Sequence, residues 1–108
     1  MMENNIFNVS NIDFELNDSE HFNDLVTYKN TRIERIVSRG HVTADEWLEQ
    51  SHFEFVTVLQ GEACVVFDTN ETFVLKAGDS MSIPPFQKHR VTYTSITPEC
   101  IWLAIHIQ

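Results

Sequence analysis

Two stretches decide the fold, EFVTVLQGE at residues 54–62 and GDSMSIPPFQKHRV at residues 78–91. In the first, β-branched and aromatic residues form a run that ends at a glycine, which is typical of a strand followed by a turn. In the second, a short strand-like run stops at two prolines and a new run begins at His89. Six residues separate Glu54 from Gly61, five separate Gly78 from Pro84, and four separate Pro84 from His89.

The chain around these stretches has the same two-residue period from Thr31 onward. We expect strands at residues 31–39, 53–60, 63–67, 72–75, 79–83, 89–94 and 101–107. About seven short strands with a turn signal every ~8–12 residues indicate an all-β sandwich or barrel. A parallel α/β fold is excluded, because no helix-length segment separates these strands.

The N-terminal part of the chain has a different pattern. Residues 1–30 are predicted to form an arm with a short helix, and residues 31–108 to form the barrel. The helix is indicated by early acidic residues and by Phe22, Leu25 and Val26, which would share one apolar face. A helix of about two to three turns must pack against something else to be stable.

Composition narrows the class of protein. Hydrophobic residues make up 43% and charged residues 21% of the 108 residues, which is ordinary for a globular domain. The net charge of -9 repels phosphate backbones, so we expect no nucleic-acid partner. No apolar run approaches the ~20 residues of a membrane span, and no basic signal sequence is visible, so we expect a cytoplasmic protein without membrane contact.

The two cysteines, Cys64 and Cys100, lie in apolar runs without CxxC spacing. This spacing argues against a zinc knuckle or a redox pair. We expect both to be reduced core residues, with a disulfide between them left open.

The spacing within and between the two quoted stretches resembles that of the two cupin motifs. The resemblance extends over about residues 31–107 and is strongest to small single-domain bacterial cupins of the cupin 2 type. It implies a jelly-roll β-barrel. It also implies a homodimer, because cupin barrels commonly pair through edge strands and N-terminal arms, and an unpaired apolar edge favours such pairing.

In cupins, two histidines, a glutamate and a third histidine typically hold a divalent metal in the barrel. Glu54 and His89 match the glutamate and the last histidine, but Trp47-Leu-Glu49-Gln50 stands where the first two histidines are expected. The resemblance therefore implies a metal site with fewer histidines than usual, formed by Gln50, Glu54 and His89. Glu49 is the alternative to Gln50. Imidazole and carboxylate ligands suit Fe, Mn, Ni or Zn.

Strand alternation adds candidates to this pocket. His89 is predicted to share a face with Val91 and Tyr93, and His106 with Trp102. If the isoleucines and the leucine of the last strand pack outward, His106 completes the metal site; otherwise it is a surface residue. Tyr93 and Trp102 are candidate ligand-binding aromatics, with ordinary core packing as the alternative.

The sequence thus predicts a polar barrel pocket that binds a divalent metal, a small polar molecule, or both. Glu54 and His89 are the candidate catalytic residues, because a carboxylate and an imidazole can exchange protons near neutral pH. For His89 the alternative is a structural histidine bonded to Glu54. The alternative function is a metal-free module that binds or senses a ligand, or an isomerase-like cupin that uses the Glu54/His89 pair; whether the protein is an enzyme stays open.

Overall fold

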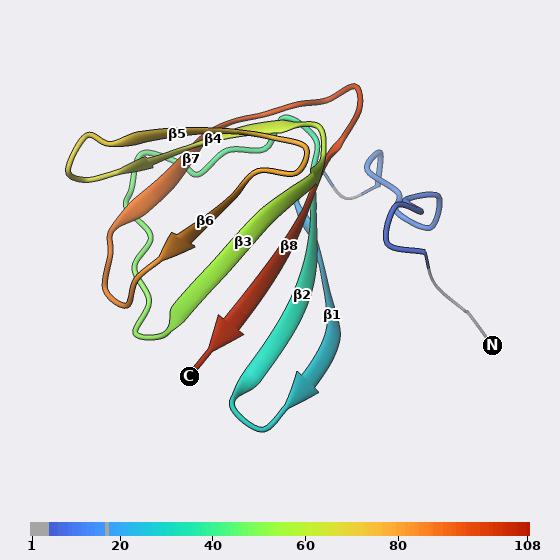
Figure 1. Ribbon diagram of the computed structural model, residues 1–108. Coiled ribbons are helices and arrows are strands. Elements are labelled where there is room, and N and C mark those ends of the chain that lie inside the picture. The colour runs from blue at the N-terminus through green and yellow to red at the C-terminus, as the bar shows by residue number, and fades with distance from the viewer. Residues whose placement is uncertain (1–4, 17) are drawn as a thin grey trace.

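The computed structural model describes residues 5–16 and 18–108, and every regular element within these ranges is a β-strand (Figure 1). The strands are β1 His21–Tyr28, β2 Thr31–Ser38, β3 Phe53–Gln60, β4 Glu62–Phe67, β5 Thr72–Lys76, β6 Ser80–Ile83, β7 His89–Thr94 and β8 Cys100–Ile107. The seven strands expected from Thr31 onward all occur, each with ends within one residue of those predicted. Nowhere in these ranges is there a helix long and apolar enough to cross a membrane.

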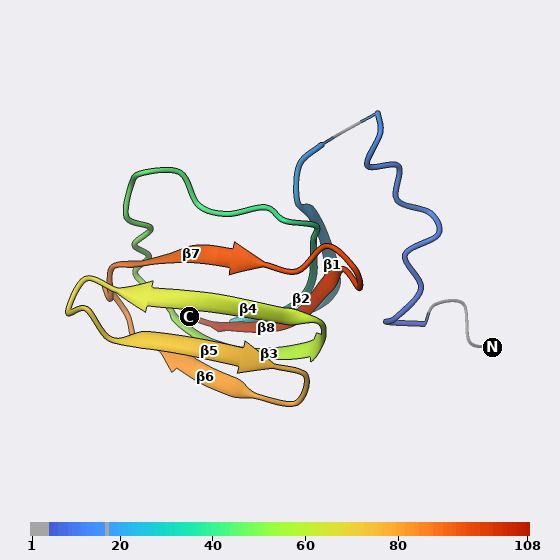
Figure 2. The ribbon, with the colours of Figure 1, turned by 90° about the horizontal axis from the view of Figure 1, so that it is seen from above.

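The strands form two antiparallel sheets that face each other across the core. The larger sheet has the order β1-β2-β8-β3-β6 and the smaller one the order β5-β4-β7 (Figures 1 and 2). Strands that are neighbours in sequence are often on different sheets, so the chain crosses between the sheets as in a jelly roll. The prediction of an all-β jelly-roll barrel is confirmed.

The predicted N-terminal helix is wrong. Residues 21–28 instead form β1, an edge strand that pairs antiparallel with β2 across a tight turn at Lys29 and Asn30. The backbone groups of such a short segment gain a full ladder of partners on β2, whereas a two-turn helix is marginal in water. Phe22, Leu25 and Val26, whose spacing suggested a helix, all lie on this strand, where Leu25 is the extra residue of a bulge between Asp24 and Val26. The division of the chain at residue 30 stays a prediction.

Apolar side chains from both sheets meet in one main core. Its buried members include Val56 and Val58 of β3, Val65 of β4 and Trp102 of β8. A second, smaller cluster lies on the outer face of the large sheet, where Phe14 of the N-terminal arm covers residues of β2 and β8. The large sheet is therefore covered on both faces at this end.

The connection between β2 and β3 runs along β7 and closes one side of the barrel. Its Thr43 backbone N–H donates to the Val91 carbonyl at 2.9 Å. Further along, Leu48 and His89 exchange two backbone hydrogen bonds, of 2.8 and 3.0 Å. This connection brings Gln50 close to the start of β7, the strand that begins at His89.

A glycine at the β3–β4 junction is required by both conformation and space. Gly61 has a φ of 82°, and a Cβ there would lie 2.4 Å from the Ser95 hydroxyl oxygen and 2.9 Å from the Glu99 carbonyl oxygen. The Ser95 hydroxyl cannot move away freely, because it accepts the Glu62 backbone N–H at 3.0 Å. Gly78 has a similar φ of 96° but open space around it.

We expect Gly61→Ala to destabilise the protein much more than Gly78→Ala. Both substitutions place a side chain at positive φ, which costs about 1 kcal/mol. Only Gly61→Ala adds steric overlap with backbone atoms, and we expect it to lower the free energy of unfolding by a further ~2 kcal/mol or more. Urea unfolding of both variants measures the difference, and equal losses would contradict the argument.

Candidate functional site

A cavity of about 210 Å³ lies between the two sheets. Five of the residues predicted for the site line it, namely Gln50, Glu54, His89, Trp102 and His106. They come from the connection before β3, from β3, from β7 and from β8, so the site depends on both sheets. The open question about His106 is answered, since its side chain is buried against the cavity.

Glu54 is held on the cavity wall by a neighbouring amide. Only 8% of Glu54 is exposed, and the Gln50 side-chain amide donates to its Oε1 atom at 2.6 Å. Among the described residues, the Oε2 atom of Glu54 has no hydrogen-bond partner. One carboxylate oxygen is thus fixed and the other is free to meet a ligand.

His89 is oriented by the backbone rather than by Glu54. Its Nδ1 lies 2.9 Å from the Gln87 carbonyl oxygen, and 6% of the residue is exposed. A carbonyl oxygen only accepts, so Nδ1 carries the proton and Nε2 of the neutral ring has a free lone pair. Within the described part of the chain Nε2 has no bonded partner. Glu54 and His89 do not form a hydrogen bond with each other, so the alternative of a structural histidine bonded to Glu54 is wrong.

His106 belongs to a chain of polar side chains that the sequence did not reveal. Its Nε2 lies 3.0 Å from Oε1 of Glu34, and its Nδ1 lies 2.8 Å from Nε2 of His52. Because a carboxylate only accepts, His106 donates to Glu34 and, when neutral, accepts the N–H of His52. Arg32 extends the chain toward solvent, with Nη1 3.1 Å from Glu34 and 3.0 Å from Asp24.

Glu34 and His52 were not predicted as residues of the site. The two-residue period of β2 places Glu34 on one face with Ile36, which also lines the cavity, and this signal was available. The pairing of β2 with β8, which brings Glu34 close to His106, depends on long-range register that a single sequence does not show. His52 precedes β3 by one residue, and two-residue alternation places it on the face of Glu54, but it does not stand where the motif expects a histidine.

Trp102 lines the other end of the cavity. Its indole N–H donates to the Ser38 hydroxyl at 3.1 Å, and that hydroxyl donates to a carboxylate oxygen of Glu20. The neighbouring Cys100 is fully buried, and burial, together with the charge of Glu20, raises the pKa of its thiol to about 12. Such a thiol stays protonated near neutral pH, and both cysteines are free, as expected.

Tyr93 does not line the cavity. The prediction that it shares a strand face with His89 is wrong. Val91 pairs with Val65 and Tyr93 pairs with Cys64, so Thr92 is an extra residue that forms a bulge in β7. A bulge reverses the alternation beyond it. Tyr93 is therefore 48% exposed on the outer side, while His89 and Val91 face the cavity.

The predicted metal ligands do not fit a transition-metal site in this arrangement. Both ring nitrogens of His106 are occupied by protein partners. The nitrogen of Gln50 donates to Glu54, so Gln50 could offer a metal only its carbonyl oxygen, which is a poor ligand for Fe, Ni or Zn. Of the predicted ligands in the described ranges, only His89 offers a free imidazole nitrogen, in the same cavity as the second oxygen of Glu54. In the described part of the chain no group of three or more His, Cys, Asp or Glu side chains is placed to hold a metal ion.

Comparison with known proteins places this chain in a wider family. The family model described as "Cupin domain" matches residues 34–106. A proposed mannose-6-phosphate isomerase from Ralstonia eutropha JMP134 superposes with a TM-score of 0.86 at 27% identity, covering 100% of this chain and 99% of that one. Among curated proteins, none matches the sequence.

More distant solved structures share the fold. A proposed ethanolamine utilization protein Q from Salmonella typhimurium LT2 gives a TM-score of 0.67 at 24% identity, covering 82% of this chain and 68% of that one. A cupin superfamily protein from Desulfitobacterium hafniense DCB-2 gives a TM-score of 0.69 at 19% identity, covering 83% and 78%.

The hydrogen-bonded side chains of His52, His106 and Glu34 make the stability of the protein depend on pH. Burial lowers the pKa of His52, and the neighbouring His106 and Arg32 lower it further against the opposing charge of Glu54. A histidine whose pKa is lower in the folded chain binds fewer protons there than in the unfolded chain. The free energy of unfolding therefore falls as the pH drops below the unfolded value of 6.5.

We expect His52→Gln to lose less stability than the original protein between about pH 7 and about pH 5.5, because the group that binds protons on unfolding is gone. Thermal unfolding at a series of pH values measures this. His21→Gln is the control, since His21 lies on β1 outside this chain of hydrogen bonds. Equal pH slopes for His52→Gln and the original protein would contradict the argument.

Proposed function

The chain belongs to the cupin domain family, and we propose that its barrel cavity binds a small polar molecule, with Glu54 and His89 as an acid–base pair and without a resident metal. One observation carries the proposal. The Nδ1 atom of His89 is bound to a backbone carbonyl, which leaves Nε2 free in the same cavity as the free oxygen of Glu54.

The two groups suit proton transfer for different reasons. Glu54 is a buried carboxylate with a single protein hydrogen bond, so a ligand hydroxyl or C–H can approach its second oxygen. His89 has a fixed ring orientation with Nε2 free, and an imidazole can both give and take a proton. An isomerase needs this combination, because one group removes a proton and another returns it. A binding module without chemistry would use the same contacts and is the alternative.

The charge of the cavity favours a neutral or cationic ligand. Three acidic residues line it, Glu20, Glu34 and Glu54, and neither lysine nor arginine is among the lining residues in the described ranges. A phosphate group would meet repulsion there without a cationic partner. The likeness to the proposed mannose-6-phosphate isomerase thus supports acid–base isomerisation, but this cavity favours an unphosphorylated substrate.

Metal content separates this proposal from the metal-bound one. We expect protein purified without chelator or a nickel column to contain well under one Fe, Mn, Ni or Zn per chain by elemental analysis. We also expect no rise in melting temperature when these ions are added, because a ligand that binds only the folded state would raise it. Near-stoichiometric metal that disappears in His89→Ala would overturn the metal-free site.

The same preparation tests the ligand class. A panel of neutral polyols and hydroxy-ketones, amines and phosphorylated sugars is screened by thermal shift. We expect a neutral or cationic compound to raise the melting temperature by a few degrees at about 100 times its Kd. Glu54→Gln and His89→Ala should weaken its binding about tenfold, the loss expected for one hydrogen bond to a charged or polar group.

Glu62→Gln, on β4 outside the cavity lining, is the matched control for Glu54→Gln and should leave binding unchanged. Stabilisation by phosphorylated compounds alone would contradict the proposed ligand class. The expected cytoplasmic location stays a prediction.

We also propose that two copies pair through the β1 edge. β1 is an edge strand of eight residues, and its Phe22, Val26 and Tyr28 side chains are all exposed. An exposed apolar edge strand is a ready surface for strand pairing with a second chain. The other edge strands are shorter: β5 has five residues, β6 has four, and β7 has six and is bonded to the β2–β3 connection.

Sedimentation at micromolar concentration should give twice the mass of the chain. Val26→Asp places a charge on the β1 edge and should shift the protein to a monomer. Val74→Asp makes the same change at an exposed position of β5 and should leave the dimer intact. A monomer in the original protein, or dissociation by Val74→Asp alone, would contradict pairing through β1.

A further inference from the structure

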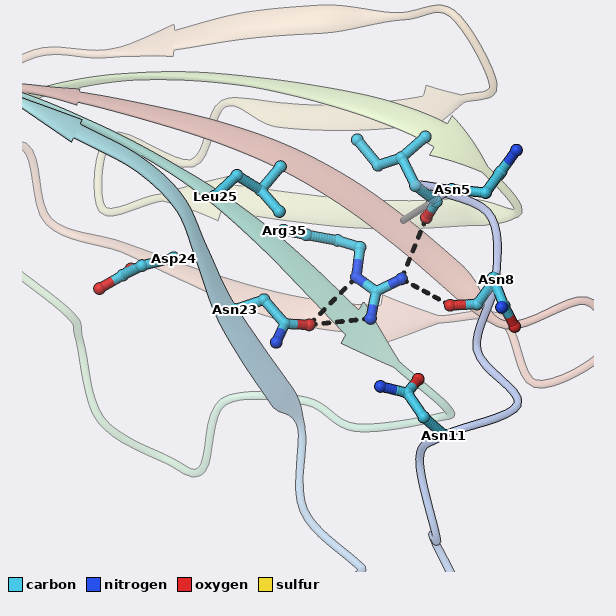
Figure 3. Close-up of a pocket in the computed structure, with 8 residues that line it drawn as sticks. Asn5, Asn8, Asn11, Asn23, Asp24, Leu25 and Arg35 are labelled. Atoms are coloured by element: carbon cyan, nitrogen blue, oxygen red, sulfur yellow. Dashed lines mark hydrogen bonds between the residues drawn. The ribbon is translucent and has the colours of Figure 1, made fainter. Parts of the chain in front are cut away.

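A second cavity, of about 450 Å³, lies on the opposite face of the large sheet, under the N-terminal arm (Figure 3). Residues of the arm form one wall, and residues of β1 and β2 form the other. Volumes of about 300–1,000 Å³ are typical of ligand sites. It is polar, unlike the apolar barrel interior, and four asparagines and an arginine are among its lining residues.

The arginine is buried without an ionic partner. Arg35 is 6% exposed, and its Nε and Nη2 donate to Oδ1 of Asn23 at 3.2 and 2.8 Å. Its Nη1 donates to the carbonyl oxygens of Ile6 and Asn8 at 3.2 and 2.7 Å, as Figure 3 shows. All these acceptors are neutral, and no carboxylate of the described residues forms an ion pair with Arg35. Burial accordingly lowers the pKa of this guanidinium.

One N–H group of the Arg35 guanidinium has no partner among the described residues. Arginine has five N–H groups, and the four hydrogen bonds to Asn23 and to the arm use four of them. The remaining N–H is on Nη2. A buried cation with neutral partners gains most from an anion that reaches it, because in a low-dielectric site opposite charges attract more strongly than in water.

The asparagines around the guanidinium present donors rather than acceptors. The side-chain oxygen of Asn5 accepts the Phe7 backbone N–H, and that of Asn8 accepts the Ser10 backbone N–H and hydroxyl. The oxygen of Asn23 is taken by Arg35. Within the described ranges the NH₂ groups of these three cavity-lining asparagines have no protein acceptor, so they remain available as N–H donors.

The one acid on the cavity wall is paired with a cation. Asp24 has its Oδ1 atom 3.0 Å from Nη1 of Arg32, which also contacts Glu34. A purely structural role, in which Arg35 only holds the arm to the sheet, would explain the bonds to Ile6 and Asn8. It would not explain a cavity of this volume lined with unused donors beside an uncompensated cation.

We propose that this cavity binds a small organic carboxylate, with Arg35 as its anchor and the asparagine amides as further donors. The ligand's carboxylate accepts the free N–H of Arg35, and its remaining polar atoms accept from the amides. This site is independent of the barrel cavity, whose acidic lining favours the opposite ligand charge.

The test is a titration of the full ¹⁵N-labelled chain with succinate, followed on the Nε–Hε signal of Arg35 by NMR. We expect a saturable shift of this signal at millimolar concentration or below. Acetate and inorganic phosphate are titrated separately. Absence of a saturable shift with succinate and acetate would overturn the proposal, and tighter binding of phosphate than of either carboxylate would overturn the ligand class.

Asn11→Asp tests the position of the site without removing Arg35. Asn11 lines the cavity, is exposed, and makes no side-chain hydrogen bond within the described ranges, so this change should not unfold the protein. Its added negative charge should weaken succinate binding about tenfold or more, because like charges repel in the cavity.

Asn70→Asp, the same substitution in the exposed β4–β5 turn, should leave succinate binding unchanged. Equal succinate affinity in Asn11→Asp and Asn70→Asp would place any binding elsewhere and overturn the proposal. Arg35→Met should abolish the binding; if that variant unfolds, the Asn11→Asp comparison still decides.

Discussion

Strand β8 forms backbone pairs along its whole length with β2 on one side and along most of it with β3 on the other, and this double pairing fixes the site. A strand held on both edges cannot slip by one residue without turning every side chain to the other face. Trp102 and His106 must therefore face the barrel interior, while Ile101 faces the arm and packs under Phe14. The barrel cavity and the covered outer face of the sheet both follow from this one register.

Polar groups inside an apolar barrel are stable only with partners, and the partners here decide which atoms remain for a ligand. His106 is held by Glu34 and His52, and Trp102 by Ser38. Each of these groups is stabilised at the cost of its freedom to bind anything else. Among the described site residues, the groups left without a protein partner include Nε2 of His89 and one oxygen of Glu54. Near residue 50, where the first two cupin histidines are expected, the Gln50 amide orients Glu54.

Local sequence patterns predicted the strands, because these depend on short-range alternation. The resemblance to the cupin motifs predicted that Glu54 and His89 line one cavity, as they do. The failures come from features that such patterns do not contain. The segment after residue 18 has helix-like spacing, yet the ladder offered by β2 makes it a strand. Tyr93 is turned outward by a single extra residue in β7, and the partners of His106 come from strand register between distant segments. A bulge and a long-range register are properties of the pairing of two strands, not of either one alone.

The same alternation that builds the barrel site also separates charge across the large sheet. Glu34 and Arg35 are adjacent on β2 and necessarily point to opposite faces, one into the barrel and the other under the arm. Glu34 finds cationic and imidazole partners inside, whereas Arg35 finds only neutral oxygens outside. The barrel cavity is consequently acidic and the outer cavity is rich in N–H donors, although the chain as a whole carries a charge of -9. Two neighbouring residues of opposite charge thus give one sheet two cavities suited to ligands of opposite sign.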